Sequence, residues 1–311
     1  MTDQDTKVRR AAFRFLEAQA GIVGNQEVVL NWQVLTEGFD FEGRKVPLVS
    51  VQGIFKPAIL DLPLTIRTAP PVDEKPPPYE DEFSDEGLIS YKYRGDNPQH
   101  RDNLGLRKVW ENNLPLVYLF GLLPGKYLAV WPVFIAGDDP DGLTFTVAVD
   151  TGDALLGRVA EDGAGIIEDE GTGARRRYVT TTVKKRLHQH SFRERVLRAY
   201  REQCSVCRLR HAELLDAAHI VPDTEGGMAT VNNGLALCKL HHAAFDRYIL
   251  GVRPDLVVEI RSDILEEVDG PMLQHGLKLL HGGRIRVPRR DDFRPATGFL
   301  EQRYEKFLRA G

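Results

Sequence analysis

The 311-residue sequence predicts an α+β protein of about two domains, a β-rich domain followed by a smaller domain held by metal. Three observations predict this class. The N-terminal segment has helical periodicity, short apolar runs separated by turn residues follow it, and all three cysteines lie in one C-terminal window. With 42% hydrophobic residues, the chain can bury ordered cores and does not have the composition of a disordered protein.

The N-terminal segment is expected to form two helices. Residues 6–20 place Val8, Ala12 and Leu16 at helical spacing among charged residues. A second helix is expected over residues 26–37. Both would precede the β-rich part of the chain.

Six short runs after Phe41 are apolar or alternate between apolar and polar residues, with Gly, Pro, Asn or Asp between them. Such a series is typical of a β barrel or sandwich. One segment among them, "DNLGLRKVWENN", has helical periodicity instead. The runs expected to form strands are "VPLVSVQGIF", "LPLTIRTA", "LISYKYRG", "LPLVYLFGL", "YLAVWPVFIAG" and "LTFTVAVD".

An acidic, glycine-rich stretch from Thr151 to Gly173 separates the two predicted domains. The predicted domains are residues 1–152 and 181–311, with a linker over residues 153–180. Charge changes sign after this stretch, because the residues that follow are rich in Arg and Lys.

The basic stretch ends in a predicted helix directly before the cysteines. Ser191 followed by Glu194 fits a capping box at the start of this helix. Phe192, Val196 and Tyr200 then form one apolar face. The arginines could be a solvated helix face, but their position beside the cysteines favours contact with phosphate groups.

The cysteines and one histidine form two matched pairs. Cys204 and Cys207 are separated by two residues, as are Cys238 and His241. Two pairs at this spacing can close a tetrahedral zinc site of three thiolates and one imidazole, which would be structural. The alternative is three buried free thiols and a surface histidine.

The sequence also bears on the compartment. An odd number of cysteines argues against a secreted disulfide scaffold. The N-terminal segment is charged throughout and has no signal-peptide core, and the longest apolar runs are too short to span a bilayer. We therefore expect a cytoplasmic protein without a membrane partner.

Three polar residues between and beside the ligand pairs suit metal-assisted phosphodiester hydrolysis. His219 lies in an apolar run of β character, Asn233 precedes a glycine, and His242 follows in the next helix. A neutral histidine on a strand can take a proton from water, and a helix histidine can hold a divalent ion that stabilises charge on the scissile phosphate. The asparagine can fix the loop or orient His219. Adjacent helix residues point about 100° apart, so His241 and His242 cannot easily share one task.

The segment "AAHIVP…NGLALCKLHHAAFD" resembles the HNH (ββα-metal) nuclease family, of the type with a zinc-binding CxxC…CxxH scaffold. The resemblance covers Cys204 to Gly251. It implies that His219 is the general base, Asn233 the middle residue, and His242 a ligand of a catalytic Mg²⁺ or Mn²⁺.

The chain departs from the family at one position. Many members carry Asp or His directly before the base as a second metal ligand, and here that residue is Ala218. Asp216 lies two residues further back and could substitute for it. Asp246, one helical turn after His242, is the other candidate.

The β domain, from about Phe41 to Asp150, resembles the SRA (also called YDG) fold, a PUA-like β barrel that holds a flipped modified cytosine. In that fold a Tyr-acid-acid segment and a later Y-x-G strand form the base pocket. Aromatic faces stack on an extruded base and an acid accepts from the cytosine amino group, while backbone groups of the Y-x-G strand read the remaining edge. The naming tripeptide is absent, and "PGKY" stands near its expected place. The corresponding residues are Tyr79, Asp81 or Glu82, Tyr93 and Arg94.

The whole chain resembles the SRA–HNH family of modification-dependent, type IV-like restriction endonucleases (TagI-like). This implies cleavage of double-stranded DNA that carries 5-methylcytosine or 5-hydroxymethylcytosine, by a homodimer. A second hypothesis keeps the nuclease but lets the β domain sense a small nucleotide signal that licenses unspecific cleavage. A third, outside the enzymes, is a DNA-binding zinc module with vestigial HNH residues.

Overall fold

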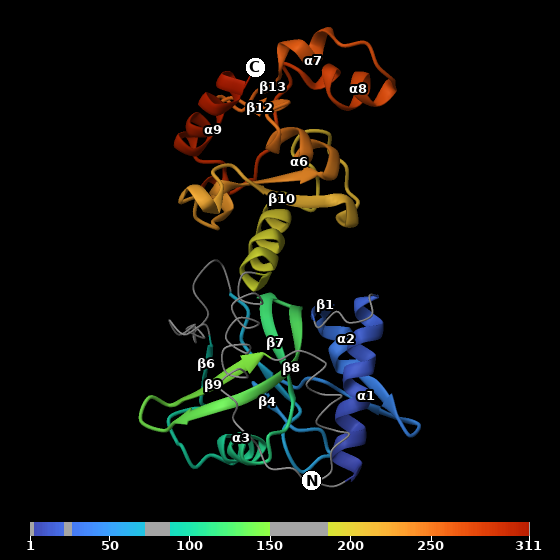
Figure 1. Cartoon of the computed structure of the whole chain (residues 1–311), viewed down its shortest axis with the longest axis vertical. Coiled ribbons are helices and arrows are strands. Elements are labelled where there is room, and N and C mark those ends of the chain that lie inside the picture. Colours follow the sequence, from blue (N-terminus) through green and yellow to red (C-terminus); the bar gives the residue numbers. More distant parts are fainter. Residues whose placement is uncertain (1–2, 22–26, 72–87, 150–185, 311) are drawn as a thin grey trace, which may run out of the picture. The chain divides into compact units, whose positions relative to one another are not determined.

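The computed structural model describes residues 3–21, 27–71, 88–149 and 186–310. The chain divides into two compact units, Met1–Leu187 and His188–Gly311. Figure 1 colours the first unit from blue to green and the second from yellow to red. Both predicted domain boundaries, after residues 152 and 180, lie outside the described residues.

The first unit combines helices with a large sheet (Figure 1). Its helices are α1 (Asp3–Ala20), α2 (Trp32–Glu37) and α3 (Arg101–Glu111). Its strands are β1 (Glu27–Asn31), β2 (Phe39–Phe41), β3 (Arg44–Val46), β4 (Ile54–Phe55), β5 (Thr65–Arg67), β6 (Ile89–Lys92), β7 (Leu116–Leu123), β8 (Lys126–Asp139) and β9 (Thr144–Val149).

Seven of these strands form one sheet, in the order β4-β5-β7-β8-β9-β6, with β1 paired to β8. The pair β5–β7 is parallel, and the other pairs are antiparallel. The first half of β8 pairs with β7 and β1, and its second half pairs with β9. One long strand therefore belongs to both parts of the sheet, which curls around it.

Both faces of the central strands β7 and β8 are buried, since successive side chains of a strand point to opposite faces. Leu116 and Tyr118 belong to the core that includes residues of α3, whereas Val117 and Leu119 belong to the core that includes residues of α1. This explains why "LPLVYLFGL" and "YLAVWPVFIAG" are apolar almost throughout. The predictions of these two strands, of α1 and of α3 are confirmed.

The prediction of one helix over residues 26–37 is wrong. Residues Glu27–Asn31 form β1, and only Trp32–Glu37 are helical. Val28 and Val29 are β-branched and pair with Ala129 and Leu128 of β8, so strand pairing outweighs the helical pattern here.

The second unit begins within a helix of residues 186–199. Its strands are β10 (Leu215–His219), β11 (Gly234–Cys238), β12 (Leu250–Val252) and β13 (Val258–Ile260). Its other helices are α6 (Lys239–Asp246), α7 (Ser262–Glu266), α8 (Pro271–Gly276) and α9 (Thr297–Ala310), with short 3-10 turns η1 (Ala212–Leu214), η2 (Asp223–Glu225), η3 (Val231–Asn233), η4 (Lys278–Leu280) and η5 (Asp291–Phe293).

The strands β10 and β11 form an antiparallel hairpin, and α6 follows it directly, which gives a ββα unit. The C-terminal residues pack around this unit. Arg303 of α9 is 6% exposed, and its guanidinium donates to the carbonyl of Phe245 at 2.7 Å. A buried cation therefore satisfies a carbonyl in the last turn of α6.

Within the described part of the chain, no helix is both long and apolar enough to cross a membrane.

Candidate functional site

His219 is the last residue of β10, where it pairs with Gly234 of β11. Its imidazole stacks on the Phe192 ring, with ring centroids 3.9 Å apart and an angle of 11° between the planes. Burial lowers the pKa of His219, and the nearby charge of His242 lowers it further, whereas Asp223 acts in the opposite direction. The residue predicted as the base is therefore held in its neutral form.

Asn233 is fully buried and holds the loop that follows His219. Its side-chain oxygen accepts from the Val221 amide at 2.9 Å, and its amide donates to the carbonyls of Val221 at 3.0 Å and Met228 at 2.9 Å. The Ile220 amide also donates to the Asn233 carbonyl at 2.9 Å. The asparagine therefore makes its contacts to the backbone beside the base.

His242 lies on α6 between two carboxylates. Its Nδ1 is 3.5 Å from Asp216 on β10, and its Nε2 is 3.4 Å from Asp246 one turn along α6. The hydrogen bond with Asp216 raises the pKa of His242 and lowers that of Asp216. Asp216 and Asp246 flank opposite nitrogens of the His242 ring. A single ion bound to one of these nitrogens would therefore have only one of the two carboxylates as a further ligand.

The two carboxylates differ in their other partners. Asp216 also contacts Lys239 at 2.5 Å and Arg193 at 3.5 Å. Asp246 is more exposed, at 59% of its side chain against 27% for Asp216. Within the described residues, Asp246 forms no ion pair besides that with His242.

Cys204, Cys207, Cys238 and His241 come together, with one candidate ligand atom from each lying within 4.8 Å of the others. The Nδ1 atom of His241 is 3.4 Å from the sulfur of Cys204 and 3.1 Å from that of Cys238, and the sulfurs of Cys207 and Cys238 are 3.9 Å apart. Hydrogen bonds from Cys207 and Cys238 lower the pKa of Cys204 and favour its thiolate, the metal-binding form. Three thiols and an imidazole at this spacing fit a tetrahedral zinc ion.

The His241 ring is oriented by a residue far along the chain. Its Nε2 is 2.8 Å from the carbonyl of Gly276, the last residue of α8. A carbonyl can only accept, so Nε2 is the protonated nitrogen and Nδ1 faces the sulfurs. This arrangement is typical of a histidine that holds a metal through its other nitrogen.

The helix before the cysteines differs from its prediction in one respect. Residues 186–199 are helical, so Ser191 lies inside the helix and the predicted capping box with Glu194 is wrong. The predicted apolar face is confirmed, since Phe192, Val196 and Tyr200 are all buried.

Two arginines of this helix have partners within the protein. Arg193 donates to the carbonyls of Ala212 and Leu215, and Arg195 donates to that of Ala229 at 2.7 Å. These two guanidinium groups therefore brace the ββα unit, while Arg198 and Arg201 of the same segment are exposed, and phosphate contact by the basic stretch stays a prediction. The part of the basic stretch before residue 186 lies outside the described residues.

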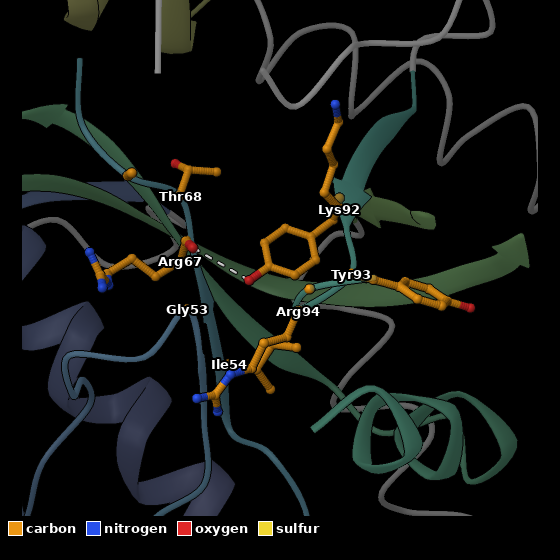
Figure 2. Close-up of a pocket in the computed structure, with 10 residues that line it drawn as sticks. Gly53, Ile54, Arg67, Thr68, Lys92, Tyr93 and Arg94 are labelled. Atoms are coloured by element: carbon orange, nitrogen blue, oxygen red, sulfur yellow. Dashed lines mark hydrogen bonds between the residues drawn. The ribbon is translucent and has the colours of Figure 1, made fainter. Parts of the chain in front are cut away.

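A pocket of about 210 Å³ opens in the first unit, beside β4, β5 and β6 (Figure 2). The hydroxyl of Tyr91 donates to the Arg67 carbonyl at 3.4 Å within this pocket. Gly53 permits this approach, because a side chain there would begin 3.2 Å from the Tyr91 hydroxyl. The lining residues are Gly53, Ile54, Arg67, Thr68, Ala69, Tyr91, Lys92, Tyr93, Arg94 and Gly95.

Two of the residues predicted for a base pocket line this pocket, but their polar groups are engaged elsewhere. The ring of Tyr93 points away from Arg67 and Thr68 in Figure 2, and it packs on Phe145 with centroids 4.5 Å apart. Its hydroxyl bonds Asp138.

The backbone at Arg94 is likewise paired. Its amide donates to the side-chain oxygen of the buried Asn103 at 2.9 Å, and its carbonyl accepts from the side-chain nitrogen of Asn103 at 3.3 Å. The Arg94 side chain forms an ion pair with Asp102. Tyr79, Asp81 and Glu82 lie outside the described residues.

Sequence reasoning missed three residues that shape these sites. Phe192 was assigned to a helix face but also covers His219, Gly276 orients His241, and Tyr91 lines the pocket. The alternation in "ISYKYRG" places Tyr91 and Tyr93 on one face, which is a signal for Tyr91. No local pattern connects Gly276 with the cysteines.

Residues 204–253 match the HNH endonuclease family. The match spans the cysteine–histidine cluster, the β10–β11 hairpin and α6. The chain therefore carries an HNH endonuclease domain and is a nuclease, and the resemblance predicted over Cys204–Gly251 is confirmed. Comparison with curated proteins gives no match.

Two solved structures are similar over most of this chain. One, "Modification dependent TagI restriction endonuclease", shares 16% identity over 79% of this chain and 81% of that chain, with a TM-score of 0.31. The other, "Type IV phosphorothioation-dependent restriction endonuclease ScoMcrA", shares 14% identity over 82% of this chain, with a TM-score of 0.23. The aligned part is 52% of that second protein. At such TM-scores the likeness assigns no substrate to this chain.

Proposed function

We propose that the protein is a modification-dependent DNA endonuclease. Its HNH domain would hydrolyse a phosphodiester bond, and its β domain, as an SRA-like barrel, would hold a 5-methylcytosine or 5-hydroxymethylcytosine flipped out of the duplex. The observation that carries the nuclease activity is the neutral His219 at the end of β10, within the segment that matches the HNH family.

His219 would act as the general base. Its Nε2 is buried and has no hydrogen-bond partner within the described residues, while the residue as a whole is half-exposed. Since Nε2 is buried, we assign the base role to Nδ1, which would take the proton from the attacking water. Asn233 would act as a positioning residue, because it fixes the backbone that directly follows His219.

His242 and one carboxylate would hold the catalytic Mg²⁺ or Mn²⁺. When bound, this ion supplies stabilisation of negative charge on the scissile phosphate and the leaving oxygen. We favour Asp246 over Asp216 as the second ligand, because Asp216 already contacts Lys239 and Arg193. An ion that must meet a phosphate also needs the more accessible side chain, and that is Asp246.

The cysteine cluster would hold a structural zinc. Its four ligands leave no open position for a substrate, as is usual for structural rather than catalytic zinc sites. Cys238 and His241 flank the junction of β11 and α6, so the ion would fix the helix that carries His242. His241 would thus stabilise the fold as a zinc ligand, and its neighbour His242 would bind the catalytic ion.

The pocket in the first unit supports recognition of a base. Its volume of about 210 Å³ leaves room for a small planar group. Tyr91 offers an aromatic ring, and recognition of an extruded base by stacking needs such a ring. We therefore propose Tyr91 in place of Tyr93 for this role, because the Tyr91 hydroxyl meets Arg67 within the pocket whereas the Tyr93 ring packs on Phe145. Both tyrosines are buried, at 5% and 4% exposed, so the Tyr91 ring would have to be uncovered for a base to stack on it.

A double-strand break needs two nicks, and each chain carries one HNH site. We therefore propose a homodimer as the form that cuts both strands. Analytical ultracentrifugation with modified duplex tests this, and a monomer that makes double-strand breaks in one binding event would contradict it.

The nuclease assignment is tested by replacing His219 with Ala. Loss of a general base typically costs about 100- to 10,000-fold in rate, so we expect that loss in cleavage, with DNA binding retained. His211→Ala is a matched control, since His211 is exposed and forms no side-chain cap. Cleavage by His219→Ala at the wild-type rate would overturn the assignment.

A further inference from the structure

Residues 284–290, "RIRVPRR", form an extended segment that we call the arginine strap. Its apolar residues face inward, because Ile285 is 6% exposed and Val287 packs on the core of the second unit. Arg284, Arg286 and Arg289 are exposed. The segment therefore presents its arginines to solvent while its apolar side chains hold it in place.

Backbone hydrogen bonds connect the strap to the catalytic hairpin. The amide of Arg286 donates to the carbonyl of Ser205 at 2.7 Å, and the amide of Ser205 donates to the carbonyl of Ala236 in β11 at 2.7 Å. On the other side, the Ile285 amide donates to the Leu256 carbonyl at 3.0 Å. The strap therefore lies two inter-strand spacings from β11, a distance on the order of 10 Å.

The strap arginines lack the carboxylate partners that the nearby Arg290 and Arg294 have. Arg290 and Arg294 pair with Asp292 and Asp291. Arg284, Arg286 and Arg289 form no ion pair within the part of the chain that the structure describes, although the whole chain has a net charge of -4. Unpaired cations on one surface of an acidic protein indicate an anionic partner.

The loop that carries the first two cysteines adds to this surface. Arg208 and Arg210 are exposed and likewise form no ion pair among the described residues. Arg208 lies in the tight turn closed by its amide and the Cys204 carbonyl at 3.0 Å, next to Ser205. The loop and the strap are therefore neighbours through the Ser205–Arg286 hydrogen bond.

We propose that the arginine strap and this loop bind the phosphate backbone of DNA beside the cleavage site, through Arg284, Arg286, Arg289, Arg208 and Arg210. The inference rests on the nuclease part of the proposed function and not on recognition of a modified base. Successive phosphates of one strand are about 3.4 Å apart along the duplex axis, so a duplex held at His219 extends over many phosphates. The strap, about 10 Å beyond β11, would meet some of these phosphates on the side of the hairpin away from β10. The segment would increase affinity for any duplex, with no preference for sequence or modification.

The test is the salt dependence of binding to an unmodified duplex, followed by fluorescence anisotropy without added Mg²⁺. The variant carries Arg284→Gln, Arg286→Gln and Arg289→Gln. The slope of log affinity against log salt should fall by about 0.9 for each lost phosphate contact, so by roughly 2 to 3 in total, measured between about 50 and 200 mM salt. A wild-type slope in the folded variant overturns the proposal.

Two further variants control for charge and folding. Arg253→Gln, Arg261→Gln and Arg309→Gln remove the same charge, but those arginines pair with Asp255, Asp263 and Glu305, so the slope should stay at the wild-type value. Replacement of the three strap arginines by Lys should keep the slope, because lysine keeps the charge; an equal loss with Lys would contradict a phosphate contact. Failure of modification dependence would appear separately, as equal cleavage of modified and unmodified DNA with the strap effect intact.

Discussion

His219 lies with one face of its imidazole covered by the Phe192 ring and its Nε2 buried. A protonated ring in this position would lose hydration without gaining a hydrogen bond to its buried nitrogen. The neutral ring is therefore favoured by the surroundings that also fix its orientation. A packing contact therefore supports the role of general base that we propose for His219.

The pH dependence of cleavage follows from this environment. Burial holds the pKa of His219 below its usual 6.5, so the ring is a neutral base at pH 7 and becomes protonated only as the pH falls further. We expect the acid limb of the cleavage rate to lie below pH 6.5 in single-turnover rates at constant ionic strength and saturating Mg²⁺ or Mn²⁺. Saturating metal is needed because the hydrogen bond with Asp216 raises the pKa of His242, which must lose its proton to hold the ion. An acid limb centred above pH 6.5 would contradict this role.

The two carboxylates beside His242 give a second prediction at the residue scale. Asp246→Asn should raise the Mg²⁺ or Mn²⁺ concentration needed for half-maximal cleavage by at least about tenfold, the size of effect known for groups that support a metal site. Asp216→Asn should change it less, because Asp216 is already paired with Lys239 and Arg193. The reverse order of the two effects would assign the ion to Asp216 instead.

The sequence was sufficient to predict that the cysteines and His241 cluster, and to find His219, Asn233 and His242 as one motif. Both predictions depend on local signals, namely ligand spacing and a short run of residues. It could not show that Asn233 points into the loop backbone or that Gly276 orients His241. Those contacts depend on where the loop and α8 pack, and packing between distant segments leaves no periodic trace in the sequence.

At the scale of elements, the strands of the first unit were predictable where burial is two-sided. The runs that form β7 and β8 are apolar almost throughout. A helix that packs against a core on one side needs apolar residues on that side only, so these runs favour strands that are buried on both faces. The segment of β1 and α2 was not predictable, because the pairing of β1 with β8 is a long-range contact. Helical periodicity over so short a segment does not outweigh such a contact.

The contact between the helix of residues 186–199 and the hairpin makes a prediction for Gly234. A side chain there would begin 2.5 Å from Val196 and 3.0 Å from Phe192. Gly234→Ala should therefore destabilise the second unit by about 1–3 kcal/mol, as other overpacked cores do, and should displace Phe192 from His219. Chemical denaturation gives the change in stability.

Gly298 in α9 is the matched control, since an added side chain meets no atom within 4 Å there. Gly298→Ala should leave stability unchanged or raise it slightly, because alanine favours a helix. Equal changes in stability for the two substitutions would mean that the close approach of Val196 and Phe192 to Gly234 does not cause the destabilisation.

At the scale of the whole molecule, the second unit includes more than the ββα element. The carbonyl of Gly276 orients His241, Arg303 contacts the end of α6, and Arg286 bonds to the loop that carries Cys204. The residues after the HNH match thus support the metal cluster and the helix that carries His242. We infer that they belong to the nuclease domain.

Removal of zinc should therefore affect the second unit alone. With a chelator, or in Cys207→Ser, we expect faster amide hydrogen exchange across residues 188–310 and loss of cleavage, since a structural zinc contributes directly to folding. Exchange in α1 and β7 should stay unchanged, because their cores contain no metal ligand among the described residues. Unchanged exchange around Cys204 and His241 would contradict a structural ion.

A digest of three plasmids tests most directly whether a nuclease in one unit acts on DNA selected through the other. Unmodified, 5-methylcytosine and 5-hydroxymethylcytosine plasmids are incubated with the wild-type protein and with His219→Ala in Mg²⁺ or Mn²⁺. We expect the wild type to cut one or both modified plasmids and to spare the unmodified one, while His219→Ala cuts none. Equal cutting of all three plasmids would contradict recognition of modified cytosine.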